Sequence, residues 1–146
     1  MPQTSTGRAR WNGSLAEGSG VTSTASPALA EQPITWKARI GDAAGTTPEE
    51  LIAAAWAGCY SMALSGALSG AGFEPTQLDV EVDVSFGPEE GGGFAISSAT
   101  IRVSAAVPGI DATAFGEAAE GAKVGCPVSK AFANNVPVSL DATLAG

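Results

Sequence analysis

Apolar and polar residues alternate along two long segments of the chain, 76–86 and 94–107. In the first segment, Leu78 and Val80 are separated by acidic and polar side chains. A period of two is typical of a strand with one buried and one exposed face. Because the glycine-rich stretch 87–93 joins the two segments, the pattern predicts a β-hairpin.

Shorter β-prone segments stand near both ends of the chain. Residues 8–13 and 20–25 flank a turn that contains Gly and Glu, which predicts another hairpin. Residues 34–40 also alternate and predict a strand, with Arg39 on its polar face. A final strand is expected over residues 136–144.

Three helices are predicted between these strands. The first begins after Thr47, where Glu50 completes a capping box, and a glycine ends it near Gly72. Two further helices are expected over residues 111–123 and 125–132. The predicted order is β-β-β-α-β-β-α-α-β, which makes the fold α+β.

Composition narrows the possible functions. A chain of 146 residues that is 45% apolar can form one domain, spanning residues 1–146, with a hydrophobic core. The net charge of −8 argues against nucleic acid or an anionic membrane as a partner. The long apolar helix contains Ser and Gly after a capped start, and the N-terminus shows no signal-peptide pattern. We therefore expect a core helix, no membrane span, and a cytoplasmic location.

The chain has two cysteines, Cys59 and Cys126, and no histidine. Without histidine, a Cys–His nucleophile pair is impossible. The cysteine spacing also fits neither a thioredoxin motif nor a zinc site. In the cytoplasm a cycling or catalytic disulfide is favoured over a permanent one. Thiol redox chemistry is therefore the chemistry that these residues favour.

Local surroundings leave open which thiol attacks. Cys59 lies in an apolar helix, where burial raises the pKa of a thiol, and an inert buried side chain is the simpler interpretation. A nearby Arg39 would instead lower the Cys59 pKa, because its positive charge favours the thiolate. Glu49 could hold Arg39 in place through a forked ion pair. The alternative is that Arg39 and Glu49 form only a weak ion pair on the surface. Glu49 is available because Glu50 already has a capping role. Cys126 precedes a helix start, where backbone N–H groups favour the thiolate, so local physics also allows Cys126 as the attacking thiol.

Helical geometry suggests that two chains contribute to each site. Glu49 and Cys59 are separated by roughly 15 Å along one straight helix, so they cannot touch within it. Small residues, including Ala55, Gly58 and Gly66, surround Cys59 and permit close approach of another backbone. Antiparallel pairing of this helix with its copy would bring the partner subunit's Glu49 toward Cys59. We therefore expect a homodimer.

Several sequence segments resemble one family. They read GTTPEELIAAA at 45–55, CYSMAL at 59–64, VPGID at 107–111 and AKVGCPVS at 122–129. With the start of the chain, these segments resemble the OsmC/Ohr family of osmotically inducible and organic-hydroperoxide-resistance thiol peroxidases. Arg39 before the helix and Pro-Val-Ser after Cys126 are similar to the OsmC branch rather than the Ohr branch.

The resemblance implies a fold of antiparallel β-sheets around a long central helix, in an intertwined homodimer. It also implies a peroxidase that reduces organic hydroperoxides to alcohols, with no metal or other cofactor. Cys59 would become a sulfenic acid, and Cys126 would resolve it to a Cys59–Cys126 disulfide. Arg39 would lower the Cys59 pKa and polarise the peroxide, and Glu49 would orient Arg39. A lipoyl-bearing protein or another dithiol is the expected reductant. The candidate walls of an apolar substrate pocket are Trp56, Tyr60, Met62 and Phe132.

Two other functions compete with this one. A small-molecule-binding or stress protein could use the same fold with inert thiols, but the presence of both cysteines favours the enzyme. A thiol-dependent hydrolase would need a general base, and the chain has no histidine to serve as one.

Overall fold

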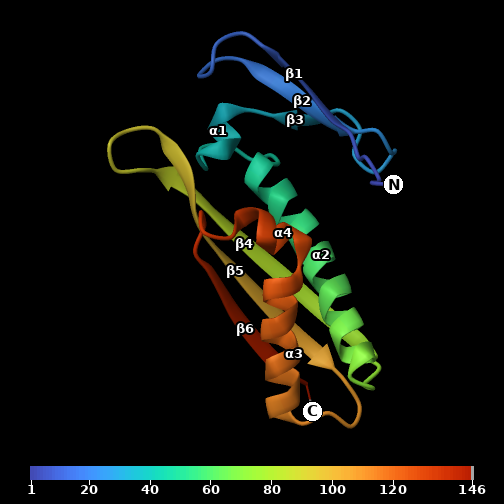
Figure 1. The fold of residues 1–146 in the computed structure, drawn as a ribbon. Helices are drawn as coiled ribbons and strands as arrows, with labels where there is room; N and C mark the ends of the chain where they lie inside the picture. Colours follow the sequence, from blue (N-terminus) through green and yellow to red (C-terminus); the bar gives the residue numbers. More distant parts are fainter. Residues whose placement is uncertain (146) are drawn as a thin grey trace. The chain divides into compact units, whose positions relative to one another are not determined.

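The computed structural model describes residues 1–145 and divides into two compact units, Met1–Pro48 and Glu49–Gly146. Strands and helices occur together, which confirms the predicted α+β class (Figure 1). Each unit has a three-stranded sheet of its own. The expectation that the chain forms a single domain stays a prediction.

The first unit contains an antiparallel sheet with the order β1-β2-β3. Its strands are β1 (Gly7–Asn12), β2 (Ser19–Thr24) and β3 (Gln32–Ile34), so the N-terminal hairpin is confirmed. Gly20 lies in the middle strand, where a Cβ atom would stand only 2.5 Å from the carbonyl oxygen of Arg10. Only glycine therefore fits at this position without moving the backbone of β1.

The predicted strand over residues 34–40 is wrong beyond Ile34, which ends β3, because the following residues form the short helix α1 (Trp36–Arg39). The Thr35 hydroxyl accepts a hydrogen bond from the Ala38 N–H over 3.0 Å and caps this helix. A capped turn satisfies backbone groups that an added strand would have paired with a neighbour. Alternation over so few residues does not distinguish the two structures.

The second unit contains the strands β4 (Gln77–Pro88), β5 (Phe94–Ala106) and β6 (Val138–Leu144). β4 and β5 form the predicted antiparallel hairpin, whereas β6 pairs with β5 in parallel. The expectation of antiparallel sheets is therefore wrong for this one pair. Two helices separate β5 from β6, and such a crossover returns the chain in the same direction.

Three helices accompany this sheet: α2 (Pro48–Gly70), α3 (Ala112–Gly125) and α4 (Pro127–Phe132). They match the three predicted helices, and α2 and α3 lie over the same face of the sheet (Figure 1). Asp111 caps α3 by accepting a hydrogen bond from the Ala114 N–H over 2.8 Å.

One stripe of α2 forms the centre of the core. Trp56, Tyr60, Leu64 and Leu68 recur every four residues and are fully buried. They belong to one hydrophobic cluster with residues of the sheet and of α3. Within residues 1–145, α2 is the one helix long and apolar enough to cross a membrane, a property that core helices share. Its buried stripe favours the interpretation as a core helix.

Candidate active site

The two cysteines meet although 67 positions separate them in sequence. The Sγ atoms of Cys59 and Cys126 are 3.1 Å apart, and both residues are free thiols. Cys59 lies in the middle of α2 and is partly exposed, whereas Cys126 is fully buried. A pair at this distance can form a disulfide, with an S–S length of about 2.05 Å, after a movement of about 1 Å.

Two helices fix the position of Cys126. Its N–H donates to the Ala122 carbonyl in α3 over 2.8 Å, and its carbonyl accepts from the Lys130 N–H in α4 over 3.0 Å. The residue therefore ends one helix and begins the next. Pro127 occupies the first position of α4, where no N–H is needed. The backbone thus holds this sulfur against α2.

The surroundings of the two thiols push their pKa values apart. Burial raises the pKa of Cys59, a backbone hydrogen bond from Val128 partly offsets this, and the neighbouring Cys126 raises it further. Burial also raises the pKa of Cys126, but hydrogen bonds from Ser129, Cys59 and Val128 outweigh burial and lower it. Cys126 is therefore the thiol of lower pKa in this pair.

The predicted pocket walls occupy different places. Trp56 and Tyr60 are fully buried, and their polar atoms donate inward, to Ser129 Oγ over 2.8 Å and to the Ala119 carbonyl over 3.0 Å. Phe132 stacks on Trp56 with ring centroids 4.9 Å apart. Within one chain these three residues therefore hold α2, α3 and α4 together, and their place in a substrate pocket stays a prediction. Met62, in contrast, is 72% exposed.

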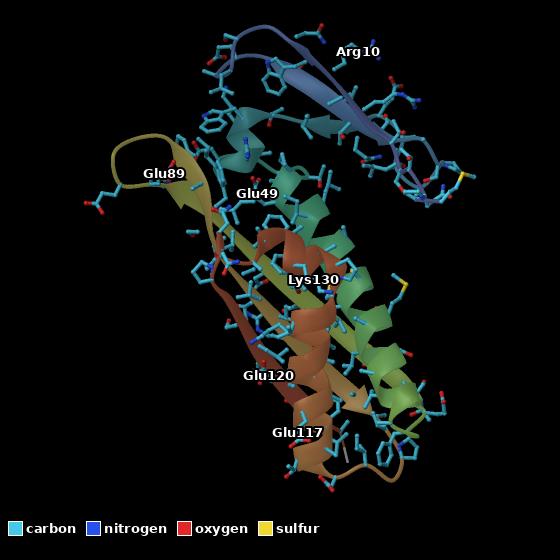
Figure 2. The ribbon with its side chains drawn as sticks, in the orientation of Figure 1. Arg10, Glu49, Glu89, Glu117, Glu120 and Lys130 are labelled. Carbon is cyan, nitrogen blue, oxygen red and sulfur yellow. The ribbon has the colours of Figure 1, made fainter. Side chains whose placement is uncertain are left out.

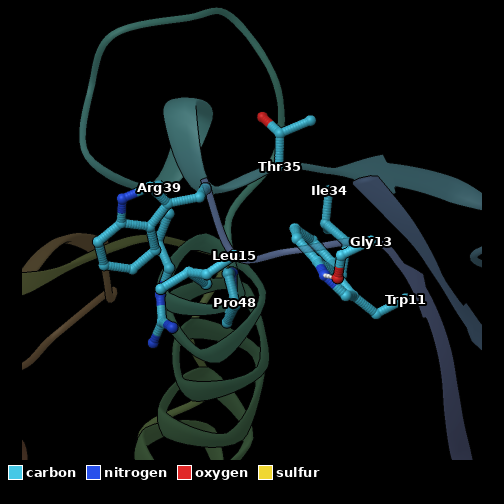
Figure 3. A pocket seen from close by; sticks show the side chains of 8 residues that line it. Trp11, Gly13, Leu15, Ile34, Thr35, Arg39 and Pro48 are labelled. Atoms are coloured by element: carbon cyan, nitrogen blue, oxygen red, sulfur yellow. Dashed lines mark hydrogen bonds between the residues drawn. The ribbon is translucent and has the colours of Figure 1, made fainter. Parts of the chain in front are cut away.

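The sequence did not predict a cavity that the first unit contains. Its volume is about 470 Å³, and Figure 3 shows the Arg39 side chain among apolar side chains in its wall. It forms because α1 replaces the predicted strand and places Trp36 and Arg39 on one helical turn. The lining residues are Trp11, Gly13, Leu15, Ile34, Thr35, Trp36, Arg39 and Pro48.

The two acidic residues at the start of α2 differ, as the sequence suggested. Glu49, which Figure 2 labels at the start of α2, is only 6% exposed, whereas Glu50 is exposed. A buried carboxylate requires hydrogen-bonding or charged partners. Arg39 belongs to the first unit, and Glu49 and both thiols belong to the second. Contacts of Arg39 with Glu49 and Cys59 stay predictions.

Comparison with known proteins identifies the family. The sequence model of the OsmC-like protein family matches residues 41–141. Peroxiredoxin OsmC of Escherichia coli (strain K12) is 44% identical over 135 residues, which cover 92% of each chain. The chain belongs to the OsmC family. The recognition made from sequence is thereby confirmed.

Solved structures confirm the OsmC fold. An organic hydroperoxide resistance protein from Elizabethkingia anophelis superimposes with a TM-score of 0.75 at 25% identity, covering 99% of this chain and 100% of that one. The organic hydroperoxide resistance protein OhrB of Bacillus subtilis gives 0.71 at 28% identity, covering 94% and 98%.

In this OsmC chain, four residues carry the predicted chemistry: Cys59, Cys126, Arg39 and Glu49. The structure brings the two thiols into contact and buries Glu49. Sequence reasoning missed Ser129, which accepts a hydrogen bond from Trp56 and helps to lower the pKa of Cys126. Among residues 1–145, no three His, Cys, Asp or Glu side chains are arranged to hold a metal ion.

Proposed function

We propose that this OsmC-family protein is a thiol-dependent peroxidase that reduces organic hydroperoxides to alcohols. The 3.1 Å contact between the Cys59 and Cys126 sulfurs carries the proposal, because it supplies a nucleophile and a resolving thiol together. The names of its relatives, a peroxiredoxin and organic hydroperoxide resistance proteins, support peroxide detoxification.

The reaction has two thiol steps. The Cys59 thiolate attacks the distal peroxide oxygen, the O–O bond breaks, and the organic fragment leaves as an alcohol after protonation. Cys126 then attacks the Cys59 sulfenic acid, hydroxide leaves, and a disulfide forms. Cys59 takes the first step because it is partly exposed, whereas no peroxide can reach the fully buried Cys126 without local opening. A dithiol, such as a lipoyl-bearing protein in the cytoplasm, restores both thiols and is itself oxidised.

Arg39 would supply the charge that Cys59 needs. Burial raises the pKa of Cys59, so the attacking thiolate requires a stabilising cation. Arg39 is the candidate, oriented by Glu49, whose burial requires a partner.

A homodimer would cover the outward face of α2. This face carries exposed small residues and the exposed Met62. A Cβ atom added at Gly58 or Gly66 would touch nothing within 4 Å, so nothing in the described part of the chain requires glycine there. Glycine inside a helix costs about 1 kcal/mol relative to alanine. Packing against the α2 helix of a second chain would explain both glycines.

Peroxide consumption tests the proposed function. Reduced protein is mixed with cumene hydroperoxide or hydrogen peroxide, with dihydrolipoamide as the reductant. We expect turnover of the organic peroxide, with one disulfide formed per chain when the reductant is omitted. No consumption while both thiols remain titratable would instead favour a binding or stress protein with inert thiols.

Replacing Arg39→Ala is expected to move the pH profile of the peroxide reaction upward by about one to three pH units, because an opposite charge nearby favours the thiolate. The measurement is the rate of Cys59 oxidation against pH. Arg10→Ala is the matched control, since Arg10 lies in the same unit with its side chain 70% exposed beside Glu31. An identical profile for Arg39→Ala and wild type would remove Arg39 from the mechanism.

A further inference from the structure

A buried hydrogen bond joins α2 to the first turn of α4, the helix that Cys126 begins. Trp56 Nε1 donates to Ser129 Oγ over 2.8 Å. Trp56 is fully buried, and Ser129 is 7% exposed. Ser129 lies three positions after Cys126, and its neighbouring polar groups help to lower the pKa of the Cys126 thiol. The peroxide chemistry described above assigns no role to Trp56 or Ser129.

The chemistry of indole sets the direction of these bonds. An indole N–H can donate but cannot accept, so the Ser129 oxygen is the acceptor of the first bond. The hydroxyl hydrogen of Ser129 is then available for the neighbouring sulfur. Consecutive hydrogen bonds polarise one another where the dielectric constant is low. The Trp56 bond therefore polarises the Ser129 hydroxyl in the first turn of α4, and the stack of Trp56 on Phe132 fixes the orientation of the indole.

We propose that Trp56 and Ser129 are positioning residues that hold Cys126 ready to resolve the oxidised Cys59, through the Trp56–Ser129 hydrogen bond at the start of α4. This inference rests on the proposed peroxidase function. In the resolving step, the Cys126 thiolate attacks the sulfur of the Cys59 sulfenic acid. The S–S bond forms, the S–O bond breaks, and hydroxide leaves and is protonated to water.

Other ionisable side chains lie on the three helices of this unit. They are Glu49, Glu50, Cys59 and Tyr60 on α2, Glu117, Glu120 and Lys123 on α3, and Lys130 on α4. Figure 2 labels Glu49, Glu117, Glu120 and Lys130 among them. Lys123 is paired with Glu120 over 2.8 Å. Burial, Glu120 and Cys126 raise the pKa of Tyr60, so its phenol stays neutral while the thiols titrate. The acidic residues and Arg102 of the sheet lie on its opposite, exposed face.

Titration of a single thiol tests the inference without peroxide. In a Cys59→Ser background, the ultraviolet absorbance of the Cys126 thiolate is measured against pH. Because the pKa of Tyr60 is raised, tyrosinate does not contribute to the absorbance in the pH range where the thiol titrates. Adding Ser129→Ala is expected to raise the midpoint by about one pH unit, which is a tenfold change in ionisation at a given pH. Trp56→Phe, which keeps a ring on Phe132 but lacks the N–H, is expected to raise it as well.

Two further variants separate this role from general stability. Ser129→Thr keeps the hydroxyl and is expected to restore the low midpoint. Ser139→Ala removes another side-chain hydrogen bond, to Thr100 on the exposed sheet face, and is expected to leave the midpoint unchanged. If Trp56→Phe and Ser129→Ala both titrate like the Cys59→Ser background, the inference is overturned.

A single-turnover measurement then separates the inference from the proposed function. With both cysteines present and one equivalent of cumene hydroperoxide, Ser129→Ala is expected to slow disulfide formation by about tenfold relative to Cys59 oxidation at neutral pH. An unchanged ratio of the two rates would overturn the positioning role. If wild-type protein consumes no peroxide, the peroxidase proposal and the resolving role fail together, while the titration still decides whether the hydrogen bonds stabilise the thiolate.

Discussion

Cys59→Ser is expected to reduce peroxide turnover by at least about a thousandfold, because a serine hydroxyl forms no thiolate at neutral pH. The pKa values alone would favour Cys126 as the attacking thiol, because the hydrogen bonds around it give it the lower pKa. Accessibility favours Cys59 instead, because Cys126 is fully buried and Cys59 is partly exposed. The measurement is the steady-state rate with cumene hydroperoxide and dihydrolipoamide.

The control for this variant comes from the same helix. Ser69→Ala removes a hydroxyl that bonds Glu74 near the end of α2, and it is expected to keep the wild-type rate. Circular dichroism should show that both variants are folded. Rapid oxidation of Cys126 by peroxide in Cys59→Ser would contradict the assignment and make Cys126 the attacking thiol.

Cys126→Ser is expected to undergo one rapid oxidation and then stop. Cys59 still reduces one equivalent of hydroperoxide, but the serine cannot displace hydroxide from the sulfenic acid, so no disulfide forms. Excess peroxide should then drive Cys59 to the irreversible sulfinic acid. Mass spectrometry of the intact protein would show one added oxygen per chain, followed by two.

The same variant tests whether Cys126 reacts with the Cys59 sulfenic acid or only lies beside it. Trapping with a reagent specific for sulfenic acid should label Cys126→Ser strongly and wild type weakly after one equivalent of peroxide. Sustained turnover of Cys126→Ser at the wild-type rate with dihydrolipoamide would show that the reductant acts directly on the sulfenic acid, and that Cys126 is not needed.

The regular elements of the fold were predictable because their patterns are long. The alternation in β4 and β5, and the glycine after α2, appear in the structure close to the predicted bounds. α1 was not predictable, because one Thr35 hydrogen bond decides its four residues. The parallel pairing of β6 depends on how α3 and α4 cross the sheet. The pattern of apolar and polar residues does not specify the direction of β6 relative to β5.

The candidate site was predictable only in part. The family resemblance named both cysteines, but no local pattern places their sulfurs in contact. The aromatic residues of α2 were expected to line a pocket, because the family resemblance implied an apolar one. Their inward hydrogen bonds, to Ser129 and to the Ala119 carbonyl, arise from tertiary packing and place them in the core.

The long sequence separation of the two cysteines has a consequence for the newly made chain. Chains are synthesised from the N-terminus, so α2 and its Cys59 leave the ribosome before α3 and α4 exist. During that interval Cys59 has no second thiol within the chain. Under the proposed mechanism, a nascent chain that meets peroxide would lack the means to stop at the disulfide. Protection against irreversible oxidation would then arrive only when the last quarter of the protein has been made and folded.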